Sequence, residues 1–344
     1  MSVSLEVLSP SEAAEQLGVS AKALRLYEHR GLIRPARTAA GWRAYSPKDM
    51  TRLTEIVALR ALGLSMAQMA RVLDGDASAL EPALAAHQGA LEIKRRQIAE
   101  AIDRVSVMRA DLGRGAAPAP KDISRLLRPR ADASVAFALP WPWGGERFEL
   151  HEITPLTYII GPLGSGKTRL ARRLSQMLPD AAFLGLDRLT ENGDALQSRL
   201  AADPGLKARI DRRLAWLIED GATMSGALVT LLAALEADNS AVLVIDMVEQ
   251  GLDQPTQEAL IAHLRGRGAS GQPLFLLTRS SAILDLAAVG PDESIILCPA
   301  NHAPPSRVFP WPGSPGYEAV ATCLASPEVR ARTEGVIAWR PQVA

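Results

Sequence analysis

The chain has 344 residues, a length that suits two domains, and 47% of them are hydrophobic, which excludes disorder along the whole chain. Its 38 basic and 38 acidic residues cancel, so the net charge of the whole molecule does not draw it to nucleic acid or to an anionic membrane. It has two cysteines, Cys298 and Cys323, five histidines and no CxxC motif, which excludes a disulfide framework and a structural zinc site.

The sequence carries neither a membrane span nor a secretion signal that can be recognised. No apolar run approaches the roughly 20 residues that cross a bilayer, and the N-terminal stretch MSVSLEVLSPSEAAEQ lacks the basic and then apolar layout of a signal peptide. We therefore expect a soluble, cytoplasmic protein with no membrane partner.

Residues 9–31 predict two short helices joined by a tight turn. Ser9-Pro10-Ser11-Glu12 forms a capping box with proline at the first helical position, so a helix follows over EAAEQL. The turn Gly18-Val19-Ser20 ends in a residue that can cap a second helix, AKALRLYEHR, and Gly31 closes that helix. Two helices with a three-residue, glycine-containing turn are typical of a helix-turn-helix.

The second helix carries side chains that can donate to phosphates and base edges while its small and apolar residues face inward. These donors are Lys22, Arg25, Tyr27, His29 and Arg30. Between residues 20 and 60, nine basic residues stand against three acidic ones, a local charge of +6 that the balanced total conceals. The pattern suits the major groove of DNA, and a basic helix that is merely solvated is the alternative.

A hairpin and two further helices are predicted next. Gly41 permits a hairpin turn, and the aromatic and basic residues beside it would form a wing next to the recognition helix. Ser46-Pro47 opens a third helix, and the capping box Ser65-Met66-Ala67-Gln68 opens a fourth.

Two stretches closely resemble, in order and spacing, the DNA-binding domain of MerR-family transcriptional regulators over roughly residues 6–73. They are SPSEAAEQLGVSAKALRLYEHRGLIRP and GWRAYSPKDMTRLTEIVALRALGLSMAQMARVL, with Trp42 where the family commonly has tyrosine. The resemblance implies a winged helix-turn-helix that binds double-stranded DNA at a palindromic site, with RNA polymerase as a further candidate partner. Wing residues Arg43 and Tyr45 would hold the phosphate backbone. The DNA-binding set is Lys22, Arg25, Tyr27, Arg30, Arg43 and Tyr45.

After Asp74 the sequence predicts a long helix with an apolar seam. Residues of this seam recur every seven positions, a spacing that calls for a partner helix, namely Leu84, Leu91, Ile98, Val105 and Leu112. MerR-like proteins dimerise through a long antiparallel coiled coil at this place, so the resemblance implies a homodimer through residues 84–112. Packing of the seam on the chain's own C-terminal domain is the alternative. Metal-sensing relatives carry cysteines near this helix, and this chain has none before Cys298, which argues against a metal or thiol sensor of that design.

Composition separates the N-terminal part from an α/β domain. GRGAAPAPKD, at 113–122, predicts a linker, and after about Val135 the runs VAFAL, LTYII, AVLVID, PLFLLT and SIILC alternate with helical segments, which favours a largely parallel sheet. We expect NHAPPSRVFPWPGSPGY, at 301–317, to be loop before a final helix. The predicted division is 1–75 for the DNA-binding domain, 76–112 for the dimerisation helix, 113–131 for the linker and 132–344 for the α/β domain.

The strongest single motif is a P-loop between a predicted strand and a predicted helix, with the sequence Gly161-Pro-Leu-Gly-Ser-Gly166-Lys167-Thr168. Its loop residues let backbone N–H groups close around phosphates, and they are Gly161, Gly164, Ser165 and Gly166. Lys167 would reach the β- and γ-phosphates, and Thr168 would hold Mg2+. The motif predicts ATP and Mg2+ as cofactors; a glycine-rich turn without a ligand is the alternative.

A second carboxylate and a family resemblance extend this site. The run AVLVID ends in Asp246, which suits a carboxylate that orders the Mg2+ shell together with Thr168. ATMSGALVTLLAALEADNSAVLVIDMVEQGLDQPTQEALI resembles the signature-to-D-loop region of ABC-type ATPases, and the similarity covers approximately residues 132–300. The resemblance places the signature at Met224-Ser225-Gly226-Ala227, so that Ser225 and Gly226 would bind nucleotide, and the D-loop at Leu252-Asp253.

Two positions depart from the ABC pattern where water would be activated. Met247 follows Asp246 where the family has a glutamate that polarises the attacking water, and the nearest carboxylate is Glu249. Arg279 stands where the family has the switch histidine. Asp246, Glu249 and Arg279 are therefore the candidate catalytic residues, and we expect ATP binding with slow or no hydrolysis.

The motifs support one leading function and two alternatives. We expect a MerR-like, sequence-specific DNA-binding regulator whose dimer geometry is controlled by ATP binding in a fused ABC-type ATPase domain, since such domains sandwich ATP between a P-loop and a partner's signature. A DNA-transaction ATPase for repair, genome defence or a mobile element is the first alternative, and it requires turnover. A small-molecule kinase that regulates its own operon is the second, and the ABC-like signature counts against it.

Overall fold

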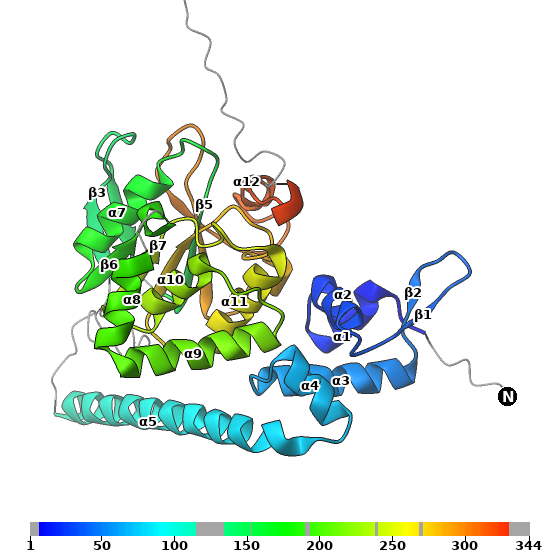
Figure 1. Ribbon diagram of the computed structural model, residues 1–344. Coiled ribbons are helices and arrows are strands. Elements are labelled where there is room, and N and C mark those ends of the chain that lie inside the picture. The colour runs from blue at the N-terminus through cyan, green and yellow to red at the C-terminus, as the bar shows by residue number, and fades with distance from the viewer. Residues whose placement is uncertain are drawn as a thin grey trace, which may run out of the picture.

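The computed structural model describes residues 7–114, 134–151, 153–189, 193–237, 240–267 and 271–329. Over these residues the chain forms a small helical domain with a two-stranded hairpin, a long helix and an α/β domain (Figure 1). This confirms the predicted fold class, a helical helix-turn-helix domain followed by an α/β domain. The predicted linker at 113–131 lies outside the described residues from residue 115 onward. The boundaries between the four predicted segments stay predictions.

Side-chain caps start the N-terminal helices at the predicted residues. Ser9 and Glu12 exchange side-chain and backbone hydrogen bonds at the first helix, and the same capping box recurs at Ser46 and Ser65. Gly41, with φ +82°, turns the antiparallel hairpin that forms the wing. The elements are α1 (Pro10–Leu17), α2 (Ala21–His29), β1 (Ala36–Arg37), β2 (Arg43–Ala44), α3 (Pro47–Ala61) and α4 (Met66–Leu73).

The long helix α5 (Leu80–Gly113) follows the short η1 (Ala77–Ala79) and carries the apolar seam. Its seam residues are 40–61% exposed, and they are Leu84, Leu91, Ile98, Val105 and Leu112. The alternative in which the seam packs on the chain's own C-terminal domain is therefore wrong for these five residues. Among the described residues, no helix, α5 included, is long and apolar enough to cross a membrane.

A six-stranded sheet with the order β10-β9-β5-β8-β7-β6 forms the centre of the α/β domain. Its strands are parallel except for the edge strand β10, which runs antiparallel to β9. The strand that precedes the P-loop, β5, is buried at every position, as expected for a parallel strand covered on both faces. The strands are β5 (Leu156–Ile160), β6 (Ala181–Leu184), β7 (Val242–Ile245), β8 (Leu274–Leu277), β9 (Glu293–Leu297) and β10 (Ser306–Val308).

Two apolar layers cover the two faces of the sheet. One face packs on α9, α10 and α11, and the other packs on α7 and the antiparallel hairpin of β3 and β4. Outside the sheet, the described elements of this domain before the final helix are β3 (Val135–Ala138), β4 (Arg147–Leu150), α7 (Lys167–Met177), η2 (Leu186–Leu189), α8 (Gly193–Ala202), α9 (Pro204–Glu219), α10 (Gly226–Leu235), α11 (Gln254–Gly266) and η4 (Leu286–Ala288).

The sequence expectations fail at the edges of this sheet. Strand β10 lies inside the stretch 301–317 that was expected to be loop, because three residues suffice to pair with β9. The edge strand β6 was not predicted, since AAFL has no alternating pattern to mark it. The final helix expected after residue 317 is present as α12 (Tyr317–Cys323).

His263, on α11, is a buried histidine that couples folding to pH. Its ring packs on Trp216 of α9 with centroids 5.4 Å apart, and burial, reinforced by the nearby charges of Arg213 and Arg267, lowers its pKa from about 6.5 to about 4. The folded protein therefore keeps His263 neutral at pH values where the unfolded chain protonates it, so its contribution is present above pH 6.5 and is lost as the pH falls towards 4.

We predict that His263→Phe, which keeps an aromatic ring but cannot be protonated, removes this part of the pH dependence. Relative to the variant, the native chain should lose about 3 kcal/mol of unfolding free energy between pH 7.5 and pH 4. Urea unfolding of both proteins over this range measures the difference. Parallel stability curves for the two proteins would show that His263 does not titrate in this way.

Candidate functional site

The P-loop joins the end of β5 to the start of α7, as the motif predicts. Gly164 and Gly166 have φ values of +79° and +89°, a region that favours glycine. A Cβ on Gly161 would lie 2.3 Å from the backbone oxygen of Cys298 and 2.7 Å from the Ser165 hydroxyl. The tight loop therefore requires glycine at three of its positions.

Lys167 and Thr168, the first two residues of α7, bring the polar groups of the site together. The Lys167 amine donates to the backbone oxygens of Gly161 and Pro162 at 2.7 Å each, and burial lowers the pKa of this amine. The Thr168 hydroxyl donates to Asp246 Oδ2 at 2.9 Å. The two predicted Mg2+ ligands are thus adjacent, although one comes from α7 and the other from the end of β7.

Two further observations show that these residues fit a nucleotide with its metal. Ser165 is 1% exposed, and its hydroxyl has no hydrogen-bond partner among the described residues. An orphaned polar atom of this kind, beside backbone N–H groups at a helix start, fits a phosphate oxygen. Asp246 is 6% exposed, so a carboxylate with little access to water lies where a cation would neutralise it.

The loop after Asp246 is held by Arg188, a residue that no sequence pattern marks. This arginine is 4% exposed and donates to the backbone oxygens of Gly185, Asp246 and Met247 at 2.7, 2.8 and 2.7 Å. Met247 has φ +46°, an uncommon conformation for a residue with a side chain. Arg188 therefore fixes a strained turn next to the carboxylate of the site.

Glu249 and Arg279, two of the candidate catalytic residues, are in contact. Glu249 is 2% exposed, and its Oε1 accepts from the Arg279 backbone N–H at 3.0 Å. The turn at Met247 thus directs Glu249 toward the loop that follows β8. Asp246, the third member of the set, contacts Thr168 as described above.

The predicted signature and D-loop lie at the starts of two helices that are linked to each other. Ser225 caps α10, which begins at Gly226, and Asp253 caps α11. Thr223, two residues before Ser225, donates through its hydroxyl to Asp253 Oδ2 at 2.7 Å. The residue that precedes the predicted signature is therefore hydrogen-bonded to the predicted D-loop within one chain.

The predicted DNA-binding tyrosines are not on the surface. Tyr27 is 4% exposed and Tyr45 is fully buried, and both lie in the core of the N-terminal domain with Leu24 and Ile56. Helical periodicity explains the first correction, since Tyr27 lies three residues after the buried Leu24, on the same face of α2. The second correction follows from the β-bridge between Tyr45 and Leu8, which places Tyr45 in the core of the domain.

The basic residues of the predicted DNA-binding set have three different environments. Arg25 is exposed on α2. Arg43, on the wing, pairs with Glu28 of α2 and so fixes the wing against that helix. The sequence predicted that Lys22 and Arg30 are available to DNA. In the structure both side chains contact the α/β domain.

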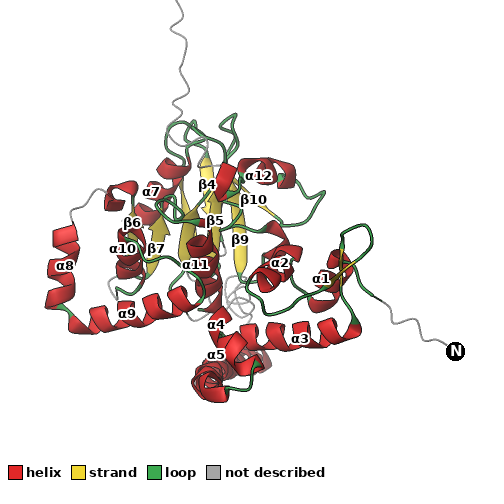
Figure 2. Cartoon of the chain, turned by 45° about the vertical axis from the view of Figure 1, so that its right-hand side comes forward, coloured by secondary structure: helices red, strands yellow, loops and turns green. Residues whose placement is uncertain are grey.

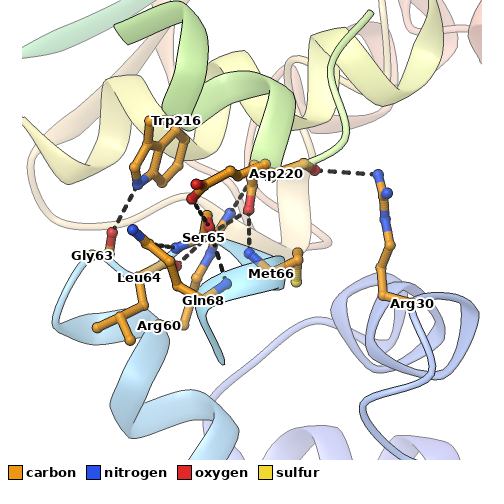
Figure 3. A network of polar contacts seen from close by, with 10 residues as sticks. Arg30, Arg60, Gly63, Leu64, Ser65, Met66, Gln68, Trp216 and Asp220 are labelled. Carbon is orange, nitrogen blue, oxygen red and sulfur yellow. Dashed lines mark hydrogen bonds and ion pairs between the residues drawn. The ribbon is translucent and has the colours of Figure 1, made fainter. Parts of the chain in front are cut away.

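A polar network joins the two domains at Asp220, at the end of α9 (Figure 3). Both carboxylate oxygens accept from Arg60 at 2.8 Å, and Oδ1 also accepts from the backbone N–H of Met66 at 2.8 Å. Trp216 donates to the Gly63 carbonyl at 3.2 Å, and the Arg60 guanidinium lies 5.5 Å from the centre of its ring. No sequence pattern marks Asp220 or Trp216 as an interdomain residue, because nothing local distinguishes an interdomain carboxylate from a surface one.

Comparison with known proteins identifies the N-terminal part. Residues 8–76 match the family described as "MerR HTH family regulatory protein". Nodulation protein NolA of Bradyrhizobium sp. (strain NC92) is 35% identical over 101 residues, which are 29% of this chain and 42% of NolA. A probable heavy metal-dependent transcriptional regulator of Haemophilus influenzae is 45% identical over 64 residues, which are 18% of this chain and 50% of that protein. The chain thus spans half or less of these relatives, and its residues 8–76 form a MerR-type helix-turn-helix domain.

Solved structures resemble separate parts of the chain. The transcriptional regulator SkgA from Caulobacter crescentus is 31% identical, with a TM-score of 0.23, and the match covers 35% of this chain and 86% of SkgA. An ATP-binding cassette of an ABC transporter in its ADP conformation is 15% identical, with a TM-score of 0.34, and the match covers 59% of this chain and 98% of the cassette.

We predict that Arg188→Met loosens the site by removing the donor from the Asp246 and Met247 carbonyls. Leaving buried carbonyls without a partner should lower the unfolding free energy by about 2–4 kcal/mol. Urea unfolding measures this loss, and Arg212→Met, an exposed arginine on α9, is the matched control. Equal stability of the two variants would contradict the positioning role of Arg188.

Proposed function

We propose that this chain is a MerR-type, sequence-specific DNA-binding transcriptional regulator whose DNA binding is controlled by MgATP at the C-terminal domain. One observation carries the proposal. Asp220, which holds the DNA-binding domain through Arg60 and Met66, lies five residues before Ser225 at the start of α10. Side-chain contacts therefore fix the DNA-binding domain to the end of α9, and five residues of chain lead from there to the predicted signature.

The residues of the P-loop divide the task of holding ATP. The backbone of 161–166 and the Ser165 hydroxyl would bind phosphate oxygens, and Lys167, which now donates to two carbonyls, would hold the β- and γ-phosphates. Thr168 and Asp246 hold the cation, which neutralises phosphate charge when it is bound. Ser225 and Gly226 would contact the nucleotide of a partner subunit.

Met247 favours a switch that binds ATP over an enzyme that consumes it. A methionine side chain cannot orient or deprotonate water, and this residue directly follows the Mg2+-ordering Asp246. ATP would then act by its presence, and its binding energy would favour one arrangement of the domains.

Glu249 favours a second candidate, a DNA-transaction ATPase. Its carboxylate is buried on the backbone of Arg279, in the loop that begins with Asp246. A carboxylate so placed could orient water if the loop shifted toward bound nucleotide. The DNA-binding domain would then deliver an ATPase to DNA.

The exposed seam of α5 supports the dimer that this function needs. Its five apolar residues lie at heptad spacing on a helix whose bounds include residues 84–112, and they are uncovered in the single chain. A homodimer through this seam would present two recognition helices to the two halves of a palindromic DNA site. It would also raise the effective concentration of the two C-terminal domains for each other, so that ATP binding could set the geometry of the dimer. RNA polymerase is a further partner in this proposal.

We predict that MgATP tightens the binding of the full-length chain to DNA by about 5- to 150-fold, the usual size of an allosteric coupling. Lys167→Ala should abolish the effect and Lys207→Ala, an exposed lysine on α9, should keep it. Fluorescence anisotropy with a duplex selected from a random-sequence pool measures both. Equal affinity with and without MgATP would contradict the proposal, and ATP turnover that DNA strongly stimulates and Asp246→Ala abolishes would favour the second candidate.

We also predict that Arg25→Ala weakens DNA binding and leaves MgATP affinity unchanged. If Arg25 contacts a phosphate, the slope of log affinity against log salt should fall by about one. A salt titration of DNA binding, with Arg212→Ala as the control variant, measures this change. Native affinity of the Arg25 variant at physiological salt would show that α2 does not enter the groove in the proposed way.

A further inference from the structure

The recognition helix α2 is held against the α/β domain at both of its ends. Near its start, the Lys22 amine lies 3.3 Å from Glu258 Oε1 on α11 and donates to the backbone oxygen of Ser281 at 3.3 Å. After its last turn, Arg30 donates to the backbone oxygen of Asp220 at 3.2 Å. Figure 2 shows α2 beside α11.

The contact at Arg30 depends on a glycine. Gly221 has φ +100°, and a Cβ at this position would lie 1.7 Å from Arg30 Nη2. The arginine therefore lies directly on the backbone that follows α9, where a side chain would displace the guanidinium and where the positive φ favours glycine. A close approach of this kind indicates a specific contact between the two domains.

This arrangement is incompatible with insertion of α2 into DNA. An α-helix with its side chains is about 10–12 Å across, and the major groove is about 12 Å wide, so the groove walls approach both flanks of a recognition helix. The flank of α2 that carries Lys22 and Arg30 already contacts α11 and the end of α9. Lys22, whose side chain is 38% exposed, and Arg30 thus have protein oxygens as partners, while Arg25 is exposed.

The interface around these anchors is open enough to separate. A cavity of about 730 Å³ lies between the domains, lined among others by Lys22, Leu26, Trp216, Glu258 and Arg265. Around Lys22 the two domains are thus joined by discrete polar contacts beside an open groove, while Asp220 joins them through a buried group.

The contacts that hold α2 belong to the elements around the candidate nucleotide site. Glu258 lies on α11, whose N-cap is the D-loop residue Asp253. The Thr223 hydroxyl donates a hydrogen bond to Asp253 Oδ2 at 2.7 Å. Thr223 in turn lies between Asp220 and Ser225 in the chain. A shift of the signature or the D-loop therefore moves the groups that hold both ends of α2.

The third anchor reaches the site by a separate route. Ser281 follows Arg279 and Ser280 in the chain. The Ser280 hydroxyl donates to Gln257 of α11 at 2.6 Å, and the Arg279 backbone N–H donates to Glu249. Glu249 lies in the loop that begins with Asp246, the partner of Thr168. Hydrogen bonds and short chain segments thus connect the P-loop to Lys22.

We propose that the α/β domain inhibits DNA binding by holding α2, and that rearrangement of the nucleotide site releases the helix. The second half of this proposal rests on the proposed function, in which MgATP binds at the P-loop. In the held state Lys22 and Arg30 bind protein, and in the released state they are available to DNA. MgATP would shift the equilibrium toward the released state in proportion to its preference for that state.

A charge reversal on the α/β domain tests the inference without touching the DNA-binding surface. Glu258→Arg places a cation opposite Lys22 and should tighten DNA binding of the nucleotide-free protein about tenfold. Asp211→Arg makes the same change in charge at an exposed site on α9 and corrects for the added attraction to DNA. Affinities are measured by anisotropy on the selected duplex, with circular dichroism to verify folding.

Labelling of lysines gives a second measurement that needs no variant. In the native chain, Lys22 should react slowly with an acylating reagent without nucleotide and several-fold faster with MgATP, while Lys207 serves as the exposed reference. Mass spectrometry of the labelled peptides gives the ratio of the two rates. An unchanged ratio would overturn the release step.

The outcomes separate this inference from the proposed function. If MgATP tightens DNA binding of the native chain but Glu258→Arg binds no better than Asp211→Arg, the holding of α2 is wrong and the proposed function stands. If MgATP has no effect on the native chain but Glu258→Arg binds DNA tighter than its control, α2 is held and the control by ATP is wrong.

Discussion

The arrangement of this molecule depends on one buried carboxylate, that of Asp220. With its side chain 2% exposed, it must be paired, and its partners Arg60 and Met66 belong to the other domain. Removing one partner of such a pair leaves an uncompensated buried charge, which costs about 3–5 kcal/mol. The orientation of the DNA-binding domain on α9 is therefore specified by charge and hydrogen-bond geometry, where apolar packing alone would leave it free to slide.

The parts of the site that were predictable are those whose chemistry is local. The P-loop places glycines, Lys167 and Thr168 in one short segment, so their geometry follows from a strand, a tight turn and a helix start. Asp246 was predictable because parallel strands end at one edge of a sheet. Arg188 was not, since its contacts with the Asp246 and Met247 carbonyls span 58 and 59 residues, and no spacing in the sequence records such a contact.

In the N-terminal domain, chemistry alone gave the wrong environment for several correct elements. The helices, their caps and the hairpin formed as predicted, because capping boxes and glycine turns act within a few residues. Tyr27 was assigned to DNA as a hydrogen-bond donor and by the family resemblance, and Tyr45 by the resemblance, but the rings of both tyrosines pack in the core of this small domain. Lys22 and Arg30 were assigned by charge, and a charge does not reveal whether its partner is a DNA phosphate or, as here, a carboxylate or a backbone oxygen of the other domain.

Pairs of opposite charge between the two domains contribute to the balanced charge of the chain. The basic stretch between residues 20 and 60 carries +6, and the α/β domain meets it with Asp220 and Glu258, so part of the balance is direct pairing between domains. DNA phosphates would compete for the same cations, and the two partners of Lys22 and Arg30 are mutually exclusive. Under the proposed mechanism no separate inhibitory segment would be needed, because the α/β domain itself would supply the oxygen atoms that occupy Lys22 and Arg30.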